Sequence, residues 1–104
     1  MSPDEEGLRM DEHPGIVFRS GAAGRRPAVS GTRIDVWQVI ETVKNSDNSI
    51  EEAAAYLSLP AWKVQACVRY YAAHKEEVDA WTKQAYEAAD REQEAWRREQ
   101  EALA

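Results

Sequence analysis

The spacing of apolar residues divides the chain into segments with different predicted structures. Residues 1–14 (MSPDEEGLRMDEHP) are polar and acidic and carry no regular apolar face, so we predict a disordered leader there. Residues 15–34 contain two short runs of β-branched and aromatic residues with glycines between them. These runs predict a β-hairpin in which Pro27 restricts the second strand to an edge or a strand start.

A helical period begins at Asp35. The apolar residues that follow recur at i, i+3, i+4 and i+7, namely Val36, Val39, Ile40 and Val43. Asp35 as the N-cap and Gln38 three residues later form the sequence pattern of a capping box. The turn-forming residues 45–49 (NSDNS) predict the end of this helix.

Two shorter helical patterns follow and are separated by the sequence SLP at residues 58–60. Ser49 is placed to cap the first pattern, and Pro60 suits the first turn of the second, which runs to about His74. The residues predicted to face inward are Ile50, Ala53, Ala54, Leu57, Val64, Cys67, Val68 and Tyr71.

The chain from Lys75 to Ala104 is rich in Glu, Ala, Gln and Arg and contains no glycine or proline, which predicts one long helix. Its apolar residues fall close to one side: Val78, Trp81, Ala85, Ala88, Ala89, Trp96 and Leu103. Glu92 and Glu99 interrupt that side, so the predicted helix is only weakly amphipathic.

The two helices around the SLP corner satisfy the packing requirements of a helix-turn-helix. Ala54 is a small residue where the second helix must lie close to the first, and Ser58 occupies the turn where glycine is commonest. The offsets that must be apolar fall on Ala53, Leu57, Leu59, Val64 and Cys67. We therefore predict a mainly α fold with a short N-terminal β-hairpin, a three-helix homeodomain-like helix-turn-helix core and a long C-terminal helix.

A helix-turn-helix would present the outer face of its last helix to the major groove of DNA. That face comprises Ala61, Trp62, Gln65, Ala66 and Arg69, with Lys63 beside it. Gln65 could bond an adenine edge, and Arg69 a guanine or a phosphate. Arg25 and Arg26 add a basic hairpin arm. The alternative is a solvated helix face whose tryptophan is covered by a neighbouring element.

Composition narrows the classes of function. The net charge of −6 argues against loose binding to nucleic acid but leaves room for a local basic face on a dimer. No apolar run approaches a membrane span and the N-terminus lacks the features of a signal peptide, so we expect a cytoplasmic protein. The single cysteine, Cys67, excludes an intrachain disulfide. No catalytic set, metal-ligand spacing or phosphate loop is present, so we expect no enzyme, metal or cofactor.

Several blocks of the sequence occur in the order typical of one bacterial family. These blocks are Gly31-Thr32-Arg33-Ile34, then Ser49 with Glu51, Glu52, Ala53 and Ala54, then Val64 with Tyr70 and Tyr71, and finally His74 with Glu76, Glu77, Val78 and Asp79. Residues 16–81 resemble the VapB-like antitoxins, small proteins once catalogued as a domain of unknown function. Asp35 and residues 45–48 depart from the family pattern, which has proline at the first place and a glycine-containing turn at the second.

The resemblance implies a homodimer that binds operator DNA, represses its own operon and neutralises a co-expressed toxin, typically a PIN-like ribonuclease. It divides the chain into the leader 1–14, a DNA-binding and dimerisation domain 15–79, and a partner-binding helix 80–104. The expected toxin contacts are Trp81, Tyr86, Trp96, Arg97 and Arg98, because aromatic residues and arginine often anchor interfaces. The C-terminal helix packing within the dimer is an equal alternative. A helical oligomerisation module without DNA binding is the second function considered.

Overall fold

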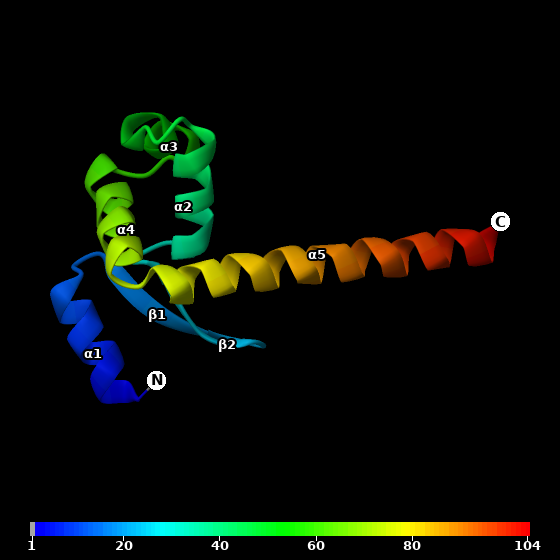
Figure 1. Cartoon of the computed structure of the whole chain (residues 1–104), viewed down its shortest axis with the longest axis horizontal. Coiled ribbons are helices and arrows are strands. Elements are labelled where there is room, and N and C mark those ends of the chain that lie inside the picture. The colour runs from blue at the N-terminus through cyan, green and yellow to red at the C-terminus, as the bar shows by residue number, and fades with distance from the viewer. Residues whose placement is uncertain (1) are drawn as a thin grey trace.

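The computed structural model describes residues 2–104. Two strands and five helices follow in the order α1 (Pro3–Glu12), β1 (Ile16–Gly21), β2 (Gly24–Val29), α2 (Val36–Asn45), α3 (Ile50–Leu57), α4 (Ala61–Ala73) and α5 (Lys75–Leu103). Helices α2 and α4 lie side by side with α3 across their ends, and α5 runs past the base of α2 and out of the body (Figure 1). The predicted mainly helical fold, the N-terminal hairpin and the long C-terminal helix are confirmed.

The hairpin is a two-stranded antiparallel sheet. Its register pairs Ile16 with Val29 and Phe18 with Pro27. Because both strands of such a sheet are edges, Pro27 can sit in β2 as predicted. The inner ends of the strands bury Ile16, Phe18 and Val29 against the helices, which supplies the support that an isolated hairpin lacks.

The core lies between the hairpin and helices α2, α3 and α4, with Val78 of α5 closing it. All four apolar residues of the predicted α2 pattern are buried, as are Val64 and Cys67 of α4. The prediction for the end of α4 was wrong in one residue: Tyr70 is 0% exposed, whereas Tyr71 is only half-buried. Tyr70 packs against Phe18 with the ring centroids 6.3 Å apart, so the hairpin decides which tyrosine turns inward.

The acidic N-terminal segment forms helix α1 and is not the disordered leader expected from its composition. The Ser2 hydroxyl accepts a hydrogen bond from the Glu5 backbone N–H at 3.3 Å, which caps the helix. Arg9 donates to the Tyr70 hydroxyl at 3.0 Å and forms an ion pair with Glu77. These partners are more than 60 residues away in the sequence, so composition alone could not reveal them. Met1 lies outside the described residues.

Two histidines line the contact between α1 and α4. The ring of His13 is 5.1 Å from that of Tyr70 and 5.7 Å from that of His74, so His13 is half-buried. Within residues 2–104, His74 Nε2 is buried without a hydrogen-bond partner. Burial, and to a smaller extent the nearby Arg9 guanidinium, lowers the pKa of His74. His74 is therefore held in its neutral form where α4 meets α5.

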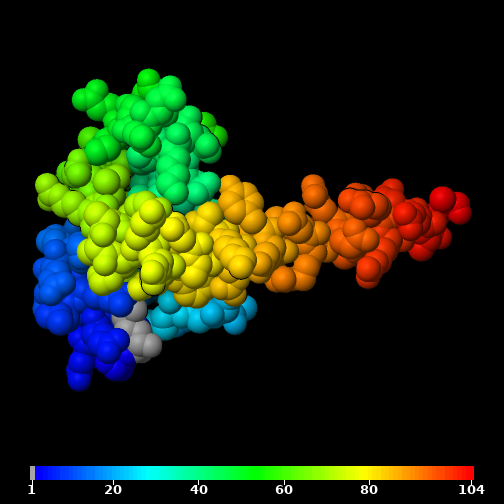
Figure 2. Space-filling view, viewed as in Figure 1, coloured from blue at the N-terminus to red at the C-terminus, as the bar shows by residue number. Residues whose placement is uncertain are grey.

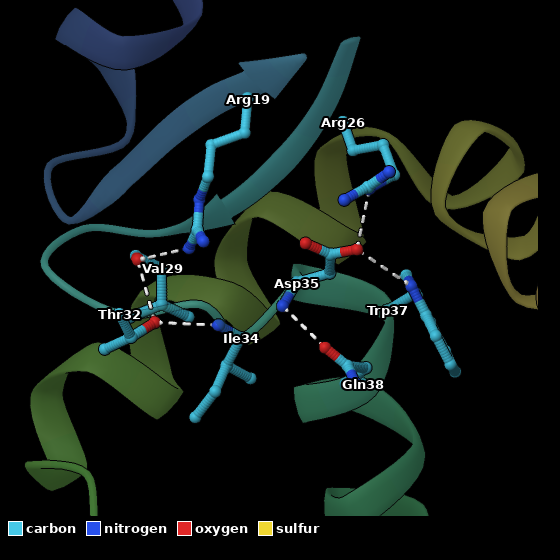
Figure 3. A network of polar contacts seen from close by, with 8 residues as sticks. All are labelled: Arg19, Arg26, Val29, Thr32, Ile34, Asp35, Trp37 and Gln38. Carbon is cyan, nitrogen blue, oxygen red and sulfur yellow. Dashed lines mark hydrogen bonds and ion pairs between the residues drawn. The ribbon is translucent and has the colours of Figure 1, made fainter. Parts of the chain in front are cut away.

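The start of α2 is fixed by a polar network around Asp35 (Figure 3). The Asp35 carboxylate accepts hydrogen bonds from Arg26 Nε at 2.8 Å and from Trp37 Nε1 at 3.2 Å. The Asp35 backbone N–H donates to the Gln38 side chain at 2.8 Å, which is the predicted return bond of the capping box. The network ties β2 to the N-terminus of α2.

Helix α5 belongs only partly to the body of the molecule. Val78 is buried, Trp81, Ala85 and Ala88 are half-buried, and every residue after Ala88 is exposed. The C-terminal half of α5 stands clear of the other elements (Figure 2). The domain boundary predicted after residue 79 falls inside this continuous helix. No helix in residues 2–104 combines the length and apolar composition that a membrane-spanning segment requires.

Candidate nucleic-acid interface

The turn between α3 and α4 is short and closed by backbone hydrogen bonds. Ser58 adopts a left-handed conformation with φ 55°. The Leu59 N–H donates to the Ala54 carbonyl at 3.0 Å and the Ser58 N–H to the Ala55 carbonyl at 3.3 Å. This is the hydrogen-bond pattern of a Schellman motif. Serine here performs the role for which glycine is commonest, and Pro60 lies immediately before α4.

The packing around this turn follows the predicted offsets. Ala53, Ala54, Val64 and Cys67 are buried, and Leu57 and Leu59 are partly buried against them. Burial raises the pKa of the Cys67 thiol to about 12, so the thiol stays protonated as expected of a structural cysteine. Among residues 2–104, no cluster of three or more His, Cys, Asp or Glu side chains has the geometry of a metal site.

The outer face of α4 lies where the sequence placed it. Trp62 is 56% exposed, and Ala61 and Arg69 are also exposed. Gln65 and Ala66 are half-buried at the edge of the same face. Within the described residues, the side chains of Gln65 and Arg69 make no hydrogen bond or ion pair, so both are free for an external partner.

The N-terminal end of this face is built against the loop before β1. Gly15 has φ +98°, and a Cβ atom there would come within 2.9 Å of Trp62 Cζ3. The Lys63 ammonium lies 5.6 Å from the Trp62 ring centroid and donates to the Ser30 carbonyl at 3.0 Å. Gly15 and Lys63 therefore hold one side of Trp62 in place and leave its other side exposed.

The two hairpin arginines proposed as DNA contacts are engaged within the protein. Arg25 pairs with Glu6 of α1 at 2.7 Å, and this hydrogen bond lowers the pKa of the Glu6 carboxyl. Arg26 pairs with Asp35 at 2.8 Å. Each arginine would have to leave a carboxylate before reaching a phosphate. The candidate interface therefore consists of α4 residues, without the hairpin arm.

The five predicted toxin contacts divide into two groups. Trp81 is half-buried and Tyr86 donates to Glu41 of α2 at 3.1 Å, so both belong to the body. Trp96 is 62% exposed on the projecting half of α5. Arg97 and Arg98 lie beside it and pair only with Glu94 of the same helix, at 3.2 and 3.7 Å. Exposed pairs of this kind contribute little, so an external carboxylate could replace Glu94.

A groove of about 480 Å³ separates α5 from the hairpin tip and was not predicted. Its lining includes Ala22, Ala23, Arg26, Trp37, Trp81 and Arg91. Trp37 was overlooked because the heptad-like spacing of α2 places it off the apolar face. The available signal was a tryptophan directly after a capping residue, where its indole N–H can reach the Asp35 carboxylate.

Comparison with known protein families gives one match. The DUF433 family, described as a protein of unknown function, matches residues 16–71, which is more than half of the chain. The chain belongs to the DUF433 family. No curated protein and no solved structure shows a significant similarity to it. The DUF433 region contains the hairpin, α2, α3 and most of α4 with the exposed face, whereas α1 and α5 lie outside it.

Proposed function

We propose that this protein is the antitoxin of a type II toxin-antitoxin system, a dimeric DNA-binding autorepressor that neutralises a PIN-like ribonuclease. The observation that carries the proposal is the face of α4 formed by Trp62, Gln65 and Arg69. It projects from the second helix of a tight two-helix unit, and its polar side chains have no partner within the described residues. The order of sequence blocks shared with VapB-like antitoxins supports the same function.

The chemistry of this face suits base reading. A glutamine can donate to and accept from an adenine edge, and an arginine can donate two hydrogen bonds to guanine. Trp62 offers a flat apolar surface to a sugar or a thymine methyl group. Two such helices in a twofold dimer meet half-sites about one DNA turn apart. In this proposal α2 and α3 support a homeodomain-like arrangement, and α4 is its recognition helix.

The double substitution Gln65→Ala with Arg69→Ala tests the DNA-reading role. We expect the Kd for the promoter of the protein's own gene to rise about 100-fold, since each good base contact contributes about 1–3 kcal/mol. A gel-shift titration at fixed salt measures the effect, and circular dichroism checks that the fold is kept.

The control is Lys83→Ala with Gln93→Ala, which removes the same charge and the same amide from exposed positions of α5. This pair should leave promoter affinity within about twofold of wild type. Equal losses in both variants would reject base reading by α4, as would an unchanged Kd in the first.

The toxin-binding role is carried by Arg97 and Arg98 on the free half of α5. Replacing both by alanine should raise the amount of antitoxin needed to halve the toxin's ribonuclease activity by about tenfold or more, because two charges opposite an acidic metal site are lost. Lys75→Ala with Lys83→Ala is the matched control for charge. Full neutralisation by the arginine-free variant would move the toxin site elsewhere.

The projecting half of α5 also fits the alternative of an oligomerisation module without DNA binding. The exposed Trp96 is the observation that favours it. The α4 experiment separates the two functions, because a module of this kind would not bind the promoter at all.

A further inference from the structure

The side of α5 that packs against the body continues beyond the body without a partner. Val78 is fully buried, and Trp96 follows it by 18 residues, which is about five helical turns. Trp96 therefore lies on the same side of α5, about 27 Å further along, where it is 62% exposed. Leu103 stands in the same relation to Ala85. A second surface is needed to cover this continuation.

The groove beside α5 has the chemistry to receive such a side chain. Trp37 and Trp81 supply its aromatic walls, and Ala22 and Ala23 leave room at the hairpin tip. Its one exposed charge without an ion pair in residues 2–104 is Arg91, because Arg26 is paired with Asp35. The groove thus combines apolar walls with an unpaired positive charge.

Trp96 carries the complementary charge beside it. Glu92 lies four residues before Trp96 and Glu99 three residues after it, so both carboxylates share its face of the helix. Both are exposed and make no ion pair with the described part of the chain. The acids that interrupt the apolar face therefore flank an aromatic side chain in the way that a groove containing Arg91 requires.

We infer that the groove is filled by Trp96 of a second copy of this chain, through antiparallel pairing of the two α5 helices. A twofold axis across the pair fills both grooves at once and closes the assembly as a dimer. A parallel pair would instead place each Trp96 against the other, about 15 Å beyond the groove. In the antiparallel pair, the level midway between Ala85 and Trp96 lies next to Arg91. Arg91 of each copy then meets Glu92 of the other.

This inference supplies the interface for the dimer that the proposed function requires, and it rests on that part of the proposal only. It assigns Trp96 to the dimer. Arg97 and Arg98 follow at about 100° per residue and point away from the paired face, so they remain available for a toxin.

The substitution Trp96→Ala tests the interface in the full chain. Trp96 is far from the core, so the fold should be unaffected. Sedimentation velocity over a concentration series should show a dimer for the wild type and a Kd raised about 30-fold or more for the variant, as for a central aromatic anchor. Trp62→Ala removes the other strongly exposed tryptophan and should leave the dimer Kd unchanged.

A charge exchange tests the antiparallel arrangement independently. Arg91→Glu and Glu92→Arg should each weaken the dimer about tenfold, and the double variant should recover most of the loss because each new pair is again of opposite sign. As a further check, Leu103→Cys should not form an intermolecular disulfide, since only a parallel pair brings the two Leu103 residues together.

Three results would overturn the inference. These are a wild type that stays monomeric up to about 100 μM, a dimer indifferent to Trp96→Ala, and a double charge variant no better than the singles. If Trp96→Ala removes toxin binding but not the dimer, the occupant of the groove is the toxin. Loss of the dimer with normal behaviour of the α4 variants would reject DNA reading and leave the interface standing.

Discussion

Replacing Tyr70 by alanine is expected to lower the free energy of unfolding by about 4 kcal/mol, the usual cost of deleting a large buried aromatic side chain. Tyr70 is 0% exposed and packs between the rings of Phe18, His13 and His74. Its hydroxyl donates to Glu77 at 2.8 Å and accepts from Arg9 at 3.0 Å. Burial and the bond to Glu77 raise the pKa of Tyr70, so the hydroxyl remains a donor at neutral pH.

Urea unfolding followed by circular dichroism measures this loss, and two variants sharpen it. Tyr70→Phe removes only the hydroxyl and should cost about 1–2 kcal/mol, since Arg9 and Glu77 still pair with each other. Tyr71→Ala changes the neighbouring, half-buried tyrosine and should cost less than half as much as Tyr70→Ala. A larger loss at Tyr71 would contradict the packing of α4 described above.

Removing the carboxylate of Asp35 is expected to cost about 2–3 kcal/mol of unfolding free energy. Asp35→Ala leaves the Arg26 guanidinium and the Trp37 indole N–H without their acceptor. Both side chains line the groove beside α5, so the same change should also weaken the inferred dimer. Chemical unfolding gives the first effect and sedimentation gives the second.

A double-mutant cycle with Arg26→Ala separates the ion pair from the rest of the Asp35 network. We expect a coupling of about 1 kcal/mol, because Arg26 is still partly exposed and its pair is screened by solvent. The remaining loss is assigned to Trp37 and to the start of α2. Strict additivity would show that the two side chains act independently of each other.

Local patterns predicted the individual elements well. The helical spacing from Val36 to Val43, the cap at Ser49 and the proline before α4 gave helices α2, α3 and α4 with nearly the observed ends. The exposure of Trp62 and Arg69 was also predictable, because the apolar offsets of α4 leave only one side for the remaining residues. Whether this face reads DNA remains a proposal.

The errors arose where a residue depends on distant partners. Helix α1 was expected to be disordered because its composition is acidic and poor in apolar residues, but Arg9 and Glu6 each find a partner of opposite charge elsewhere in the fold. The choice between Tyr70 and Tyr71 could not be made from spacing, since adjacent positions both border the apolar face. The hairpin made that choice by packing Phe18 on Tyr70.

The sequence by itself determined the type and order of the elements from β1 to α5, because periodicity, caps and turn residues act within a few positions of one another. The tertiary structure alone decided that α1 folds, that Arg25 and Arg26 are held by carboxylates, and that a groove opens between Trp37 and Trp81. These features join residues from separate elements, and their geometry exists only after the hairpin and helices have packed.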